Sequence, residues 1–134
     1  MSLLETCVSV AIVTTAAAIA VPSLHQTRTD YVLTSAAHDV ASRMHSARIR
    51  AISRNIECRI HVTSGVTYTI ECLDPTWAVT DSILLPPGMM ISATARPVFH
   101  RLGNVVPAAT ITVSNAAGHQ KRVVINNGGR IRID

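Results

Sequence analysis

The chain has 134 residues and a net charge of +4, with 48% hydrophobic, 15% charged and only 3% aromatic residues. This length accommodates about one domain, which excludes multidomain dehydrogenases, kinases and barrel enzymes. Residues 1–95 carry six arginines and seven acids, whereas residues 96–133 carry bases alone, so the positive charge comes from the last third. Such a block is typical of proteins with an anionic partner, although a solvated face in an arginine-rich chain gives the same pattern.

The N-terminal segment predicts a membrane-spanning helix. Residues 6–24 form an uncharged run of nineteen residues, close to the roughly 20 that cross a bilayer. Pro22 removes one helix hydrogen bond and is expected to bend or loosen the helix there. A cleaved secretory signal is the alternative, but such a signal begins with basic residues. This segment has Glu5 and no base before Arg28.

Residues 2–5 (Ser-Leu-Leu-Glu), with the apolar run that ends at residues 18–24 (Ala-Ile-Ala-Val-Pro-Ser-Leu), resemble the N-terminus of type IV pilins and type II secretion pseudopilins. The resemblance implies that Met1 is the first mature residue, which is N-methylated after cleavage by a prepilin peptidase. It also implies that Glu5 pairs with the free α-amine of a neighbouring subunit. A charge that finds its partner only in the filament gives assembly a register.

The same resemblance implies a location and a set of partners. The protein would be a single-pass protein of the bacterial inner membrane with its head in the periplasm. It would then be assembled with other pilin or pseudopilin subunits into a pilus or pseudopilus.

From residue 29 to about residue 55 the pattern becomes that of an amphipathic helix. Apolar residues recur at steps of three and four, which predicts a stem that continues the membrane helix and is covered by a sheet. We therefore expect residues 1–28 to form a transmembrane and filament-core helix, and residues 29–134 to form the stem helix and a C-terminal β head domain. The stripe consists of Val32, Leu33, Ala36, Ala37, Val40, Met44, Ala47, Ala51 and Ile52.

Residues 57–72 alternate with a period of two on both sides of a Ser-Gly pair, which predicts a β-hairpin. A three-residue loop, 64–66, places Thr63 opposite Thr67 and matches all apolar partners on one face. The matched pairs are Val62 with Tyr68, Ile60 with Ile70, and Cys58 with Cys72. Short strands are also expected at residues 83–85, 89–93, 110–114, 122–126 and 130–133, and residues 74–81 are expected to form a loop that contains Trp77.

Three further segments resemble the FimT/GspH minor pilin family: Ala47-Arg48 with residues 51–55, residues 110–113, and the tail Gly-Arg-Ile-Arg at 129–132. This implies an α+β pilin-like fold, in which a long N-terminal helix packs on a small antiparallel β domain of two sheets. The implied location outside the cytoplasm favours oxidation of Cys58 and Cys72 to a disulfide. Two buried thiols remain the alternative.

The tail carries the main candidate binding residues. On a strand, Arg130 and Arg132 lie on one face about 7 Å apart, and guanidinium groups bind phosphate oxygens bidentately. In FimT-like proteins a Gly-Arg-x-Arg tail is implicated in binding DNA during uptake, so the resemblance nominates these two arginines. Lys121, Arg122 and Arg101 are added on charge alone.

A structural role for the tail is the alternative. The arginines would then pair with Asp134 or a neighbouring subunit, or keep an edge strand soluble. The sequence offers no stacking platform for bases, because Tyr31 and Tyr68 lie on apolar faces and Trp77 and Phe99 are isolated. Binding to double-stranded DNA is therefore expected to be directed at the phosphates and insensitive to base sequence.

No pattern predicts an enzyme, a cofactor or a metal centre. The sequence has no helical His-Glu pair, no glycine-rich phosphate loop and no nucleophile elbow. Cys58, His61 and Cys72 do not make a convincing metal trio, because His61 alternates to the other face and a fourth ligand is missing.

Two functions follow from these patterns: a minor pilin that binds DNA during uptake, or a structural GspH-like pseudopilin at the tip of a type II secretion filament. A membrane-tethered domain that never assembles is a third, weaker reading.

Overall fold

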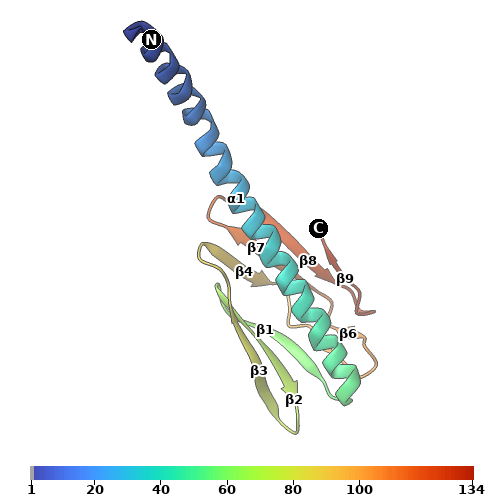
Figure 1. Cartoon of the computed structure of the whole chain (residues 1–134). Helices are drawn as coiled ribbons and strands as arrows, with labels where there is room; N and C mark the ends of the chain where they lie inside the picture. Colours follow the sequence, from blue (N-terminus) through green and yellow to red (C-terminus); the bar gives the residue numbers. More distant parts are fainter. Residues whose placement is uncertain (1) are drawn as a thin grey trace. The chain divides into compact units, whose positions relative to one another are not determined.

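The computed structural model describes residues 2–134, which form two compact units (Figure 1). The first unit ends at Tyr31, and the second, the head, runs from Val32 to Asp134. Helix α1 (Leu3–Arg54) contributes to both units. The strands of the head are β1 (Cys58–Ser64), β2 (Thr67–Leu73), β3 (Trp77–Leu84), β4 (Met89–Ala93), β5 (Val98–Phe99), β6 (Val105–Val106), β7 (Ala109–Asn115), β8 (Gln120–Ile125) and β9 (Ile131–Ile133).

The first unit is helical and apolar. Its helix begins at Ser2, whose hydroxyl accepts a hydrogen bond from the backbone N–H of Glu5 at 3.3 Å. The hydroxyls of Ser9 and Thr14 donate back to carbonyl oxygens one turn earlier, so these polar groups are satisfied within the helix. An 18-residue window has a mean hydropathy of 2.0 and no buried residue, so by length and composition this helix is able to cross a membrane. Met1 and the prediction about it lie outside the described residues.

The stem helix ends at Arg54, and the next residue, Asn55, adopts the left-handed conformation with φ of 55°. The backbone N–H of Ile56 donates to the carbonyl oxygen of Ala51 at 3.1 Å, and that of Asn55 donates to Ile52 at 3.3 Å. These two bonds form a Schellman motif, in which asparagine is the usual alternative to glycine. The motif turns the chain into β1 within a few residues.

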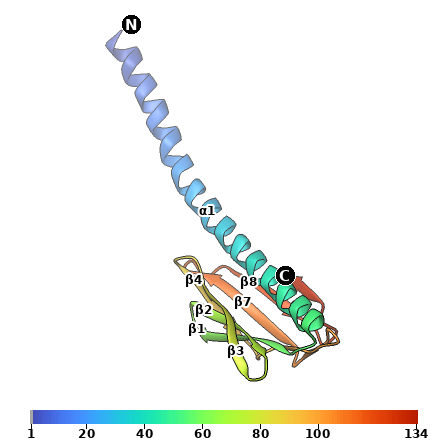
Figure 2. The same cartoon turned by 60° about the horizontal axis from the view of Figure 1, so that its bottom comes forward.

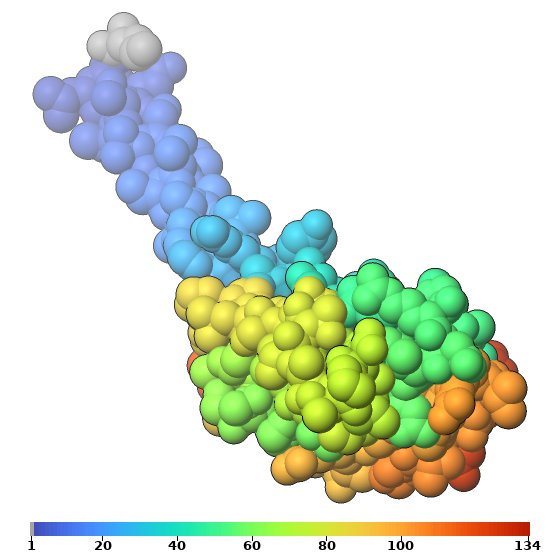
Figure 3. Space-filling view, turned by 90° about the horizontal axis from the view of Figure 1, so that it is seen from below, coloured from blue at the N-terminus to red at the C-terminus, as the bar shows by residue number. Residues whose placement is uncertain are grey.

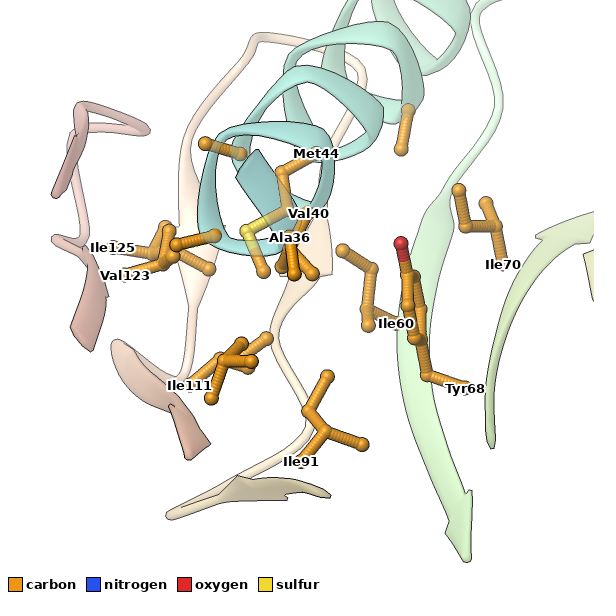
Figure 4. Packing of buried hydrophobic residues seen from close by; sticks show 14 of the residues in the cluster. Ala36, Val40, Met44, Ile60, Tyr68, Ile70, Ile91, Ile111, Val123 and Ile125 are labelled. Atoms are coloured by element: carbon orange, nitrogen blue, oxygen red, sulfur yellow. The ribbon is translucent and has the colours of Figure 1, made fainter. Parts of the chain in front are cut away.

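The head core lies between the stem and two antiparallel sheets (Figure 4). One sheet has the strand order β3-β2-β1-β5-β6 and the other β4-β7-β8-β9. Ala36, Val40 and Met44 of the stem face both sheets, as the predicted stripe requires. Ile52, which was expected to widen that stripe, is 47% exposed, so the buried face is narrower at the end of the helix than predicted.

The hairpin confirms the predicted pairs of apolar residues, including Cys58 with Cys72. The prediction for the turn was wrong: Ser64, not Thr63, lies opposite Thr67, and the register shifts between Val62 and Ser64. A β-bulge at Thr63 allows a two-residue turn without mixing the two faces. The alternation alone could not reveal this, because both turns leave the inner pairs unchanged.

Two other expectations need correction. Residues 77–81 are not a loop, because β3 begins at Trp77 and pairs with β2 along its whole length. Tyr31, expected on an apolar face, is 74% exposed, whereas Tyr68 is buried as expected. β3 is an edge strand with mixed exposure, and such strands lack the alternation by which the hairpin was recognised.

A polar cluster covers the outer face of the five-stranded sheet. Arg59 pairs with Glu71, with its Nε 2.6 Å from Oε2, and its guanidinium lies 4.2 Å from the ring centroid of Trp77. His61 Nδ1 lies 3.4 Å from Oε1 of the same carboxylate. Burial disfavours the charged carboxylate, but the hydrogen bonds from Arg59 and His61 outweigh this and lower the pKa of Glu71.

This cluster predicts a pH-dependent part of the stability. Because the pKa of Glu71 is lowered in the folded state, its contribution is present above the ordinary value near 4.5 and is lost as the pH falls through the lowered pKa. We expect Glu71→Gln to remove this part of the acid dependence in urea unfolding curves measured between neutral and acidic pH. The matched control is Asp39→Asn, which breaks an exposed pair with Arg43 elsewhere on the head. An unchanged acid profile in Glu71→Gln would contradict the assignment.

Candidate nucleic-acid interface

The tail strand β9 forms one edge of the four-stranded sheet and pairs with β8. Arg132 lies opposite Val124, and the backbones of Arg122 and Asp134 exchange two hydrogen bonds of 3.2 and 2.8 Å. Side chains two residues apart on a strand share a face, so Arg122, Arg132 and Asp134 project from the same side of the sheet. This is the side away from the core, since the intervening Val123 is fully buried.

Arg130 joins this face. It lines a shallow hollow of about 190 Å³ together with Val124, Asn126 and Arg132. Its exposed guanidinium makes no ion pair or hydrogen bond with any residue among 2–134. Two arginines that border one hollow suit an anion with several oxygen atoms, such as a phosphate diester.

Arg132 is already paired, as the structural alternative required. Its Nε lies 2.8 Å from Oδ1 of Asp134, and Nη2 donates to Oδ2 at 3.2 Å. Both side chains are solvent-exposed, and exposed pairs contribute at most about 1 kcal/mol. A phosphate can therefore compete with Asp134 for this guanidinium.

A tight turn positions Arg130. The side-chain oxygen of Asn126 accepts a hydrogen bond from the backbone N–H of Arg130 at 2.8 Å. The backbone carbonyl oxygen of Asn126 accepts one from the N–H of Gly129 at 2.9 Å. Gly129 is buried with φ of 78°, a conformation that glycine adopts without strain. Arg48 of the stem lies against it and donates from Nε to the carbonyl oxygen of Gly103 at 2.9 Å. Stem, β5–β6 turn and tail thus meet at one point.

The contact made by Arg48 is the feature that sequence reasoning missed. Arg48 appears in the sequence only as part of the stem resemblance, and its link to Gly103 and Gly129 depends on how distant segments meet. The one indication in the sequence was that Arg48, a charged residue, lies next to the apolar stripe positions Ala47 and Ala51 and could therefore contact the head.

The five nominated basic residues do not form one patch. Lys121 pairs with Val113 and therefore points to the opposite side of the sheet from Arg122. Arg101 lies in the β5–β6 turn and lines a different hollow, together with Asn55 at the end of the stem. That hollow is also lined by Glu57, whose Oε1 lies 2.9 Å from Nδ1 of His100. In Figure 3 the green segment that follows the stem lies beside the orange segment that contains this turn. The shared face therefore holds Arg122, Arg130 and Arg132.

The other nominated residues are placed as follows. Cys58 and Cys72 form a disulfide, which confirms the pairing, and both are buried. Glu5 lies in the first turn of α1 in an exposed position, and its carboxylate pairs with no residue among 2–134. The guanidinium of Arg59 covers one face of the Trp77 ring, so that face is not open to a stacking base.

Comparisons with known proteins agree with this architecture. Residues 36–129 match the family described as "Type II transport protein GspH". The fold is similar to that of the minor pseudopilin EpsH from the type 2 secretion system of Vibrio cholerae, with a TM-score of 0.68 and 15% identity over 76% of this chain and 95% of that chain. It is also similar to the type IV minor pilin FimU of Pseudomonas aeruginosa, with a TM-score of 0.63 and 19% identity over 76% and 92% of the two chains. No curated protein sequence matches the chain significantly.

Proposed function

Since the chain belongs to the GspH family of type II transport proteins, and is thus a minor pilin or pseudopilin, we propose that it is a membrane-anchored filament subunit whose head offers three arginines to the phosphates of DNA. The observation that carries the proposal is the shared outer face of Arg122, Arg130 and Arg132. Arg130 and Arg132 line one hollow on this face, and the guanidinium of Arg130 is unpaired among residues 2–134.

Assembly is the first step of the proposed function. A prepilin peptidase generates the mature terminus, and the apolar helix holds the subunit in the bacterial inner membrane with the head in the periplasm. The helix then moves from the bilayer into the filament core. Glu5 stands alone in an apolar stretch, and a charge buried there without a partner is costly. Pairing with the α-amine of a neighbouring subunit at Met1 removes this cost only in the correct register.

We therefore expect Glu5→Ala to reduce incorporation into filaments by about tenfold or more, because the variant loses a buried pair and its register. The measurement is the fraction of this protein in sheared filaments, relative to the fraction in membranes. Ser9→Ala is the matched control, since Ser9 lies one turn further along the helix and bonds only within its own backbone. Normal incorporation of Glu5→Ala would overturn the register role of Glu5. Absence of both the unsubstituted protein and the variant from filaments would support a tethered domain that never assembles.

DNA binding is the second step. The strands of the four-stranded sheet contain no acid, and Asp134 is the acid beside the three arginines, so the face carries a surplus of positive charge. With no free aromatic platform in this face, recognition is confined to the phosphate backbone. Each head then binds weakly and without base preference, and several heads in a filament add their contacts.

The test is binding of the soluble part, residues 29–134, to duplex DNA at several salt concentrations. Three phosphate contacts predict a slope of about −2 to −3 in a plot of log affinity against log salt. We expect Arg130→Gln/Arg132→Gln to lower the affinity about tenfold or more and to flatten that slope. The matched control is Arg101→Gln/Lys121→Gln, which removes the same charge from other surfaces and should change the affinity far less. Equal losses in the two variants would indicate a general charge effect and overturn the assigned face.

A structural role in a type II secretion filament is the second candidate, and the ion pair between Arg132 and Asp134 favours it. An edge strand with a fixed ion pair is suited to contact with a neighbouring subunit. If the head binds no DNA at low salt, whereas Arg130→Gln/Arg132→Gln blocks incorporation into filaments, this role replaces the first.

A further inference from the structure

Three turns come together at one end of the head. The β1–β2 turn contacts the β3–β4 connection, because the backbone N–H of Leu85 donates a hydrogen bond to the carbonyl oxygen of Val66 at 2.9 Å. The backbone N–H of Ile91 donates to the carbonyl oxygen of Gly65 at 2.7 Å, which connects β4 to the same turn. Met89 pairs with Asn115, so the β7–β8 turn lies at this end as well. We call the exposed apolar residues of these turns the end surface: Val66, Leu84, Pro86, Pro87, Met90, Ala116 and Ala117.

The end surface is apolar and uncharged. Leu84 is 73% exposed, Met90 59% and Val66 44%. Residues 62–70, 82–95 and 109–118, which supply these turns, contain no charged side chain. The methyl of Met90 lies over Gly65, within van der Waals distance of a β-carbon placed there, so the Met90 side chain lies against the turn that carries Val66. Exposed apolar residues gathered on neighbouring turns mark a binding surface more often than scattered apolar residues do.

The position of the end surface identifies its partner. It lies at the end of the head where the head's part of α1 begins, at Val32 (Figures 1 and 2). The uncharged run ends at Leu24, and the helical rise from there to Val32 is about 12 Å. The interfacial layer of a bilayer is about 5–7 Å thick on each side, and membrane helices tilt by about 20°. A tether this short allows the end surface to reach the interfacial layer while the helix is in the membrane.

We infer that the end surface docks on the phospholipid surface of the membrane that holds α1. This inference rests on the proposed membrane anchoring. Leu84, Met90 and Val66 enter the interfacial layer, where apolar side chains are favourable. Lys121 lies three residues beyond Gly118 on β8, and its ammonium group makes no ion pair with any residue among 2–134, so it can meet lipid phosphates at the rim. Docking holds the head against the bilayer before assembly and must be released when the subunit enters a filament.

The test uses tryptophan fluorescence of the full chain in vesicles of phosphatidylcholine and phosphatidylglycerol. The chain has one tryptophan, so Trp77→Phe gives a silent background that keeps a ring beside Arg59. Three reporters are then compared: Leu84→Trp in the end surface, Leu102→Trp in the β5–β6 turn and Val13→Trp in the membrane helix. Leu102 is the matched control, because it is apolar and 93% exposed but lies outside the end surface. The quencher is phosphatidylcholine with brominated acyl chains.

We expect brominated lipid to quench Val13→Trp and to reduce Leu84→Trp emission by about twofold or more, while Leu102→Trp changes by less than about 10%. Adding Val66→Glu/Met90→Glu to Leu84→Trp should abolish its quenching. Quenching of Val13→Trp without that of Leu84→Trp overturns the docking and leaves the anchoring intact. No quenching of Val13→Trp overturns the anchoring itself. If Leu84→Trp is shielded only at high protein-to-lipid ratios, the end surface binds other subunits instead, which also overturns the docking on lipid.

Discussion

Gly129→Ala is expected to destabilise the head by about 3–5 kcal/mol and to displace the tail arginines. A side chain at φ of 78° costs about 1–2 kcal/mol by itself. The added β-carbon would also overlap the carbonyl oxygen of Gly103 and lie 2.8 Å from Nε of Arg48. Relief of this overlap breaks the hydrogen bond between Arg48 and Gly103, which adds about 1.5–3 kcal/mol for a charged donor. Urea unfolding of residues 29–134 measures the loss.

Gly118→Ala separates backbone strain from the clash. Gly118 has φ of 87°, but a β-carbon there meets nothing within 4 Å. We therefore expect a loss of only about 1–2 kcal/mol, from the left-handed conformation alone. If both variants lose the same free energy, the meeting point of Arg48, Gly103 and Gly129 does not constrain the tail. If Gly129→Ala alone also loses DNA binding, the turn positions the arginines as well as stabilising the head.

The sequence predicted those parts of the fold that depend on local periodicity. The stem stripe from Leu33 to Ala51 and the matched pairs of the hairpin follow from one-sided burial, which selects a single register. The bulge at Thr63 leaves the inner pairs unchanged, so the same periodicity is compatible with it and with the expected turn. The start of β3 at Trp77 escaped prediction because an exposed edge strand needs no alternation.

In the candidate site, too, only the features that depend on local spacing could be predicted from the sequence. Arg130 and Arg132 were recognisable because their spacing on a strand fixes their face. The separation of Lys121 from Arg122 was also available from alternation, since adjacent residues on a strand point to opposite sides. The position of Arg101 away from this face could not be predicted from alternation, because it depends on strand order and on the contact of the β5–β6 turn with the end of the stem. Contacts between distant segments leave no period in a sequence.

Reduction of the disulfide between Cys58 and Cys72 is expected to lower the free energy of unfolding of the head by about 3 kcal/mol. The bond closes a loop with a sequence separation of 14, and a loop of that length restricts the unfolded chain by about this amount in the entropic model. Both sulfurs lie in the core, so reduction leaves the packing nearly unchanged, whereas substitution by alanine would also create a cavity. Reduction is therefore the cleaner measurement.

Equilibrium unfolding of residues 29–134 in urea, with and without reductant, gives the result directly. For a domain of this size, a loss of about 3 kcal/mol lowers the midpoint by about 2–3 M urea. Residues 29–134 lack Cys7, so this bond is the only thiol chemistry that the reductant can change. Cys58→Ala/Cys72→Ala should lose at least as much as reduction and should no longer respond to reductant. Equal midpoints with and without reductant in the unsubstituted protein would mean that the register of the hairpin, and not the bond, holds β1 against β2. The head would then be equally stable in a reducing and in an oxidising compartment.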